Sequence, residues 1–183
     1  MYFEKPGEEN TEATLIVARE IACQRRIAHL VVASTSGATG LRAVEMCKDA
    51  PVSVVVVTHN TGFRESGEQE FDQEVRRMIE ELGGKICTGT MVLRGLGAAV
   101  RGQGGYTHEQ IVADTLRVFG QGTKVCMEIA AMVVDAGLIP CEEVIAVAGT
   151  GRGADTAIII KPDSSNHFFL MKVKEILAKP REF

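Results

Sequence analysis

The chain has 183 residues, of which 45% are hydrophobic and 24% charged. This mixture is typical of a folded domain, argues against wholesale disorder, and at this length favours one domain. The 20 basic and 24 acidic residues give a net charge of −4, so the protein has no global positive field, and neither nucleic acid nor a membrane is expected as a partner.

The terminus and the cysteines predict a cytoplasmic protein. No apolar run reaches the roughly 18 residues of a membrane-spanning helix, and the sequence MYFEKPGEEN is polar and acidic, unlike a signal peptide. The five cysteines are scattered, odd in number and without a close pair, which favours reduced, mostly buried thiols over a disulfide framework or a zinc site. The four histidines show no metal-ligand spacing either, and no metal is expected.

Strands and helices alternate in the first half of the chain. The expected elements are a helix from Asn10 or Thr11, either of which can cap it, to about Arg26, a buried strand at 31–33, a turn at 34–40, a helix at 41–47, a strand at 52–58, a helix at 68–82 and a strand at 85–88. The strand at 52–58 is apolar on both faces, as a central parallel strand must be when helices cover both sides of a sheet.

The second half is rich in glycine. The expected elements are helices at 91–100, 108–119 and 123–136, a strand at 144–148, a loop at 149–156, a strand at 157–161 and a short helix at 173–178. Five glycines fall between Gly95 and Gly105, so we expect this segment to be mobile or closely approached by a ligand.

The alternation predicts a single α/β domain with a largely parallel sheet. Only eight residues join the last two strands. A parallel crossover needs a dozen or more residues, so the fifth strand should run antiparallel to the fourth.

Three segments that follow strands are candidates for binding chemistry. The first comprises Ser34, Thr35, Ser36, Gly37, Ala38, Thr39 and Gly40. It opens a helix, where free amides and the helix dipole favour a phosphate. No lysine follows as in a Walker loop, so nucleotide hydrolysis is not implied. The alternative is a helix cap with spare hydroxyls.

The second segment comprises Gly149, Thr150, Gly151, Arg152, Gly153, Ala154, Asp155 and Thr156. It joins two strands and does not match the dinucleotide fingerprint, yet it holds more glycines than a hairpin needs. Arg152 is the candidate for a fixed positive charge beside an anion. A purely structural hairpin is the alternative.

The third segment is Thr58-His59, at the end of the strongest strand. Ligands of open α/β sheets sit beyond the carboxyl ends of the strands, where a histidine can donate to a ligand or move a proton. A histidine that merely caps a loop is the alternative. We interpret the other histidines, His29, His108 and His167, as structural.

These motifs resemble the C-terminal domain of pyruvate kinase. The residues that carry the resemblance are Ser34 to Gly40, Val54-Val55-Val56-Val57-Thr58-His59 and Gly149 to Ala157. The chain is still more similar to small stand-alone proteins built on that domain, whose motifs match Ala113-Asp114-Thr115-Leu116-Arg117 as well. The resemblance covers about residues 10 to 180.

The resemblance implies that residues 1–183 form one three-layer α/β/α sandwich. Its mixed sheet would have five strands in the order 3-2-1-4-5, with strand 5 antiparallel. Strands 1 and 4 would then be neighbours, and the loops after them would face each other across one crevice. The cofactor-binding residues expected at this crevice are Ser34, Thr35, Ser36, Gly37, Ala38, Thr39, Gly40, Thr58, His59, Gly149, Thr150, Gly151, Arg152, Gly153 and Asp155.

The resemblance also suggests the ligand. In pyruvate kinase the first loop binds a phosphate of an allosteric sugar bisphosphate, which here assigns a phosphate to Ser34, Ser36, Gly37 and Thr39. Many pyruvate kinases have a basic residue where this chain has Ala38, and another residue in place of His59. A single phosphate on a larger, partly apolar body therefore fits better. Stand-alone members resemble flavin mononucleotide (FMN) binders, so FMN is the expected cofactor.

Three functions remain open from the sequence. The first is a module that binds a phosphorylated small molecule, FMN by the resemblance above, without catalysis. The second is a flavin-dependent oxidoreductase with His59 and Asp155 as acid/base candidates and residues 95–105 as a lid. The third is a protein–protein module with structural glycine loops. Pyruvate kinase activity is not expected, because the barrel domain and an acidic magnesium cluster are missing. The oligomeric state stays open, with a homo-oligomer among the options.

Overall fold

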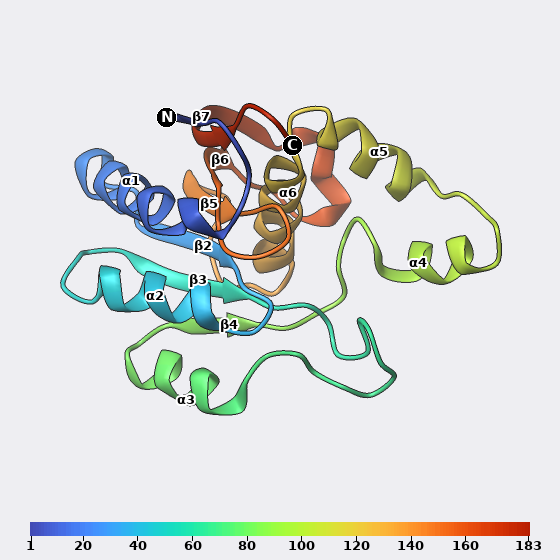
Figure 1. Cartoon of the computed structure of the whole chain (residues 1–183), viewed down its shortest axis with the longest axis horizontal. Coiled ribbons are helices and arrows are strands. Elements are labelled where there is room, and N and C mark those ends of the chain that lie inside the picture. Colours follow the sequence, from blue (N-terminus) through green and yellow to red (C-terminus); the bar gives the residue numbers. More distant parts are fainter.

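A seven-stranded mixed sheet runs through the computed structural model, which describes residues 1–183. Its order is β1-β7-β6-β5-β2-β3-β4 (Figure 1). The strands are β1 Tyr2–Phe3, β2 His29–Ala33, β3 Ser53–Val57, β4 Lys85–Cys87, β5 Val144–Ala148, β6 Thr156–Lys161 and β7 Lys172–Pro180. The helices are α1 Thr11–Arg25, α2 Ala38–Cys47, α3 Gln73–Glu81, α4 Gly95–Gly102, α5 His108–Arg117 and α6 Gln121–Asp135, with 3-10 turns η1 Glu8–Asn10 and η2 Ser165–Leu170.

The five predicted strands correspond to β2 through β6, and they lie in the predicted order. β5 and β6 are antiparallel, with Val144 paired to Ile160 and Ala148 to Thr156. The predicted number of strands was wrong, because β7 and β1 extend the sheet beyond β6.

The predicted helix at 173–178 was also wrong, since these residues belong to β7. β7 pairs antiparallel with β6, whose residues Thr156 to Ile160 are all buried. A buried strand left at the edge of a sheet would have unsatisfied backbone amides and carbonyls. Pairing with β6 therefore overrides the local preference of a short segment.

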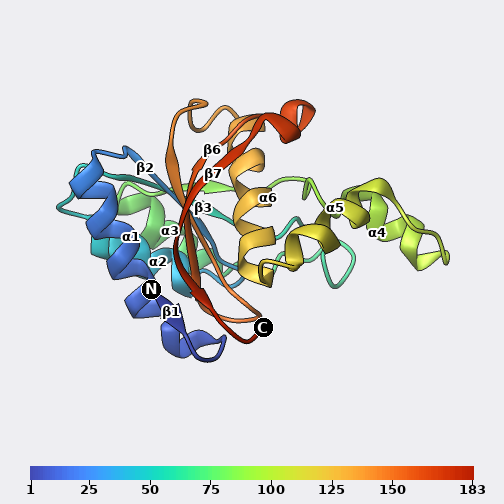
Figure 2. The ribbon, with the colours of Figure 1, turned by 90° about the horizontal axis from the view of Figure 1, so that it is seen from above.

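Helices cover both faces of the sheet and give three layers (Figure 2). α1, α2 and α3 pack on one face, over a core cluster that includes Val32 and Val56. α6 packs on the other face, over a second cluster that includes Val31 and Val55. Alternate residues of each central strand thus enter opposite cores, which explains why these strands are apolar on both sides.

The five cysteines are free, and Cys47, Cys87 and Cys126 are buried. Burial raises the pKa of the Cys126 thiol well above its usual range, and the nearby Asp155 carboxylate adds to the effect. Burial also raises the pKa of the Cys47 and Cys87 thiols. No helix combines the length and apolar character needed to cross a bilayer.

The second core makes a direct prediction about stability. Ile158 is fully buried opposite Ala146 of β5, so Ile158→Ala should lower the free energy of unfolding by about 2–5 kcal/mol. Val173, 40% exposed on β7, provides the control, because Val173→Ala should cost less than about 1 kcal/mol. Urea denaturation measures both. Equal losses would contradict the placement of Ile158 in the core.

Candidate ligand-binding site

The carboxyl ends of β2 and β5 meet at one edge of the sheet. The two strands are parallel neighbours, with Leu30 paired to Ile145 and Val32 to Val147. The loops that follow them line one cavity of about 660 Å³. From the predicted residues, the lining includes Ser34, Thr35, Ser36, Ala38, Thr39, Thr58, His59, Gly149, Gly151, Arg152 and Gly153. The strand order thus brings all three predicted segments to the same cavity.

The first loop, most of which lines this cavity, has unpaired backbone amides. Ser34 is buried, and its Oγ accepts a hydrogen bond from the amide of Gly40 at 3.2 Å. The backbone amides of residues 35–39 donate to no acceptor in the protein. They lie at the N-terminus of α2, where the helix dipole adds partial positive charge. This arrangement suits an anion that accepts several hydrogen bonds at once.

The glycines of the first loop serve packing. Gly37 has φ +108°, and a Cβ there would lie 2.5 Å from the Val75 Cγ1 of α3. A Cβ at Gly40 would lie 2.5 Å from the Val56 Cγ1 of β3. Neither glycine lines the cavity. Their lack of a side chain lets α2 approach the sheet and α3, and the prediction that they contact a ligand stays a prediction.

The second loop folds tightly back on itself. A Cβ at Gly149 would lie 2.5 Å from the carbonyl oxygen of Gly153, and one at Gly153 would collide with the Thr11 hydroxyl. Gly151, at φ +81°, has open space around it. The amides of residues 151–153 have no acceptor in the protein. The loop therefore adds a second set of free donors to the cavity wall.

Asp155 lies beneath this loop and does not line the cavity. It is fully buried. Its carboxylate accepts hydrogen bonds from the amide of Thr150 at 3.0 Å, the amide of Gly7 at 3.3 Å and the hydroxyl of Thr156 at 2.7 Å. Thr150 likewise does not line the cavity. Asp155 was predicted to contact a ligand or to act as an acid or base, and the structure places its carboxylate under the loop, which it holds through these hydrogen bonds.

The N-terminal segment braces the same loop. Asn10 does not cap α1 with its side chain, contrary to expectation, and instead donates to the carbonyl of Lys5. The hydroxyl of Thr11 accepts a hydrogen bond from the amide of Ala154 at 2.9 Å. Glu8 reaches the cavity wall. The beginning of the chain is therefore part of the site's framework.

His59 occupies the cavity wall at the end of β3. Its Nδ1 lies 2.8 Å from the Glu70 carboxylate, which also contacts Arg64 at 2.9 Å. Its ring stacks on Phe63 with the ring centroids 3.8 Å apart. The neighbouring Thr58 is buried and donates from its hydroxyl to the His59 carbonyl. His59 is therefore held in a fixed position, partly exposed to the cavity.

Several charged side chains also line the cavity, and of its cationic residues the sequence analysis had singled out only Arg152. The cationic residues of the lining are Arg64, Arg94, Arg101, Arg117, Lys124 and Arg152, against the acidic Glu8, Glu70 and Glu128. The lining therefore carries an excess of positive charge in a protein whose net charge is −4. Most of these residues come from loops and helices without a motif. The one available signal was a charged pair, Lys124 and Glu128, within an apolar helix.

Lys124 and Glu128 form a buried ion pair on α6, 2.5 Å apart, with their side chains 5% and 0% exposed. The second carboxylate oxygen of Glu128 accepts the amide hydrogen of Leu93 at 2.7 Å. The pair thus ties the segment before α4 to α6. A charge that is buried loses its hydration and destabilises the folded protein unless partners such as these compensate for the loss.

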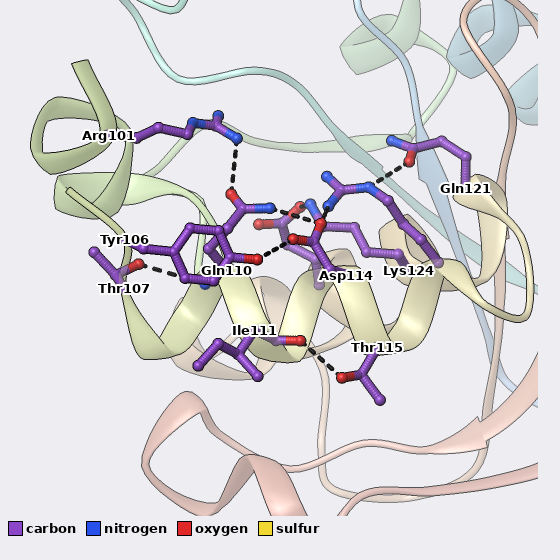
Figure 3. A network of polar contacts seen from close by, with 11 residues as sticks. Arg101, Tyr106, Thr107, Gln110, Ile111, Asp114, Thr115, Gln121 and Lys124 are labelled. Atoms are coloured by element: carbon purple, nitrogen blue, oxygen red, sulfur yellow. Dashed lines mark hydrogen bonds and ion pairs between the residues drawn. The ribbon is translucent and has the colours of Figure 1, made fainter. Parts of the chain in front are cut away.

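A polar chain continues along α5 (Figure 3). Arg101 donates to Gln110, and Gln110 donates to Asp114. Tyr106 and Arg117 also donate to Asp114. The hydrogen bond from Tyr106 is the main cause of the lowered pKa of Asp114. Arg117, held additionally by Gln121 at 2.7 Å, is thereby positioned on the cavity wall.

Apolar side chains complete the cavity. Val125, Ile129 and Met132 contribute from α6, and Met91 and Leu93 from the segment before α4. Met132 is buried in the second core, and Met91 packs against it. The cavity therefore has polar loops at one end and an apolar wall beside them.

A comparison with known protein families finds one profile that matches most of the chain. The profile described as "Pyruvate kinase, alpha/beta domain" matches residues 12–160. The chain belongs to the pyruvate kinase alpha/beta domain family. The matched span contains β2 to β5, β6 up to Ile160 and both glycine-containing loops, whereas β1 and β7 lie outside it.

One solved structure is also similar, "Crystal structure of O-ureido-L-serine synthase", at 17% identity and a TM-score of 0.33. The similarity covers 61% of this chain and 29% of that protein. The chain thus spans under a third of the length of that structure.

The buried ion pair makes a second prediction. Lys124→Met should lower the free energy of unfolding by about 3–5 kcal/mol, because it leaves the Glu128 carboxylate buried and unpaired. The double variant Lys124→Met/Glu128→Gln should recover most of the loss, since the glutamine is neutral and still accepts from Leu93. Urea denaturation of wild type, both single variants and the double variant gives the coupling energy. A loss below about 1 kcal/mol for Lys124→Met would contradict a dry, paired site.

Proposed function

We propose that the protein binds a phosphorylated small molecule in the cavity between the loops that follow β2 and β5. The observation that carries the proposal is that Thr35, Ser36, Ala38 and Thr39 of the first loop and residues 151–153 of the second line one cavity, and that their backbone amides have no acceptor in the protein. Such amides, together with a helix N-terminus, form the usual protein receptor for phosphate. The excess of basic side chains in the lining favours an anion further.

FMN is the leading ligand. The amides of the first loop and the hydroxyls of Ser36 and Thr39 are suited to its phosphate, and the apolar side chains of Ile129 and Met132 to its ring system. The cavity of about 660 Å³ lies within the range of small-molecule sites, about 300–1,000 Å³. When bound, FMN supplies redox chemistry, and the protein supplies position and electrostatics.

We further infer that this domain does not perform the pyruvate kinase reaction. Phosphoryl transfer uses carboxylates to hold magnesium at the reacting phosphate. Two of the three acids in the lining are already engaged: Glu70 by His59 and Arg64, and Glu128 by Lys124. This leaves no pair of free carboxylates for a magnesium ion.

A flavin-dependent oxidoreductase is the second candidate. It is favoured by His59, which is fixed on the cavity wall with its Nδ1 2.8 Å from the Glu70 carboxylate. A histidine paired in this way can move a proton to or from a substrate. Asp155, fully buried, is not available for this role. Substrate-dependent reoxidation of photoreduced, FMN-loaded protein would separate this candidate from simple binding.

The proposal is tested with FMN and riboflavin, which differ in the phosphate group. If the phosphate contacts the loops, FMN should bind at least about tenfold more tightly, because one charge-assisted hydrogen bond contributes roughly 1.5–3 kcal/mol. Isothermal titration calorimetry measures both affinities, and mass spectrometry of the native protein identifies any co-purified molecule. Equal affinities would place the phosphate outside the loops, and binding of neither would overturn FMN as the ligand.

A substitution at Ala38 probes the first loop without disturbing the core. Ala38 is exposed, lines the cavity and begins α2. Ala38→Glu should abolish FMN binding, because its carboxylate competes for the same amides, while the thermal midpoint stays equal or rises through the helix dipole. Ala38→Gln, of similar size but neutral, should retain substantially more affinity. Full FMN affinity in Ala38→Glu would argue against a phosphate at this loop.

A further inference from the structure

Helix α4 stands away from the rest of the protein (Figures 1 and 2). None of its residues is buried. Leu96 is 81% exposed, and Val100, four residues later on the same side of the helix, is 38% exposed. A short helix with an unpartnered apolar side gains stability when it packs against another surface.

The base of α4 is anchored, while its two ends contain glycine. Before the helix, the Leu93 amide donates to Glu128, and the Arg94 guanidinium lies 4.3 Å from the centre of the Phe63 ring. Beyond this anchor, Gly95 and Gly104 both have positive φ, +27° and +81°. Glycines at both ends of an element can absorb the dihedral changes of a hinge.

Arg101 extends from α4 to the cavity wall. Its guanidinium donates to the Gln110 side chain at 2.9 Å, as Figure 3 shows, and it has no carboxylate partner. A neutral amide leaves the positive charge of Arg101 uncompensated. An anion in the cavity would therefore attract this side chain more strongly than its present partner does.

We propose that α4 is a lid that closes over the bound anion, with Arg101 donating to the ligand. The proposal rests on the proposed function, since it needs an anionic ligand in the cavity. Closure turns the helix about Gly95 and Gly104, brings Arg101 to the ligand and covers Leu96 and Val100 against the cavity rim. The ligand itself stabilises the closed state, because only that state adds a charge-assisted hydrogen bond.

Amide hydrogen exchange tests the lid in wild type, Arg101→Ala and the control Arg77→Ala. Arg77 is an exposed arginine of α3 outside the cavity lining. Saturating FMN should slow exchange in residues 96–104 of the wild type at least about tenfold. Arg101→Ala should lose this protection and weaken FMN binding by roughly tenfold or more, the loss of one charge-assisted hydrogen bond. Arg77→Ala should behave as wild type.

The possible results distinguish a failure of the lid proposal from a failure of the proposed binding function. If FMN binds to the wild type but exchange in residues 96–104 is unchanged, the lid is wrong and the proposed function stands. The lid is equally wrong if Arg101→Ala keeps both protection and affinity. If FMN does not bind to the wild type at all, the proposed flavin site is overturned, and closure over that ligand with it.

Discussion

The parallel pairing of β2 with β5 is the constraint on which the rest of the structure depends. Leu30 pairs with Ile145 and Val32 with Val147, so two strands that are distant in the sequence end at the same level. After β2 the chain turns into α2 on one face of the sheet, whereas α6, which precedes β5, covers the other face (Figure 2). The chain diverges at this point, and a crevice forms there as in other open α/β sheets. The position of the cavity is thus a consequence of strand order.

The loops at the crevice hold their shape through groups that never reach the cavity. Asp155 accepts the amides of Thr150 and Gly7 from below, and Thr11 accepts the amide of Ala154. The amides of Gly7, Thr150 and Ala154 therefore have partners within the protein, whereas the amides of residues 151–153 have none and remain free to bind a ligand. The buried carboxylate is stabilised by its hydrogen bonds, although no basic side chain contacts it. The second loop therefore depends on the beginning of the chain for its conformation.

Sequence reasoning predicted the parts of the fold that local pattern and connection length determine. The run of residues 52–58 indicated a central strand, and the eight-residue connection indicated the antiparallel β6. Sequence reasoning failed for β7. Residues 173–178 form a strand because they pair with the edge of β6, and this partner is not part of their local sequence. Sequence reasoning also did not predict that Gly37 packs against Val75 or that Asp155 is buried, since a motif does not reveal which side of a loop faces the core. It missed Arg94 and Arg101 because only the tertiary structure brings them to the cavity.

The pairing of charges decides which cations of the cavity are available to a ligand. Drawing Lys124 away from Glu128 would leave a fully buried carboxylate unpaired, which costs about 3–5 kcal/mol and exceeds the gain from one new hydrogen bond. Lys124 is therefore a structural cation. Arg117 is likewise held by Asp114 and Gln121. Arg94, Arg101 and Arg152 have no carboxylate partner, so they are the groups whose charge an anion can use at no such cost. They come from the segment around α4 and from the loop after β5, so the proposed function would draw its free positive charge from both of these segments at once.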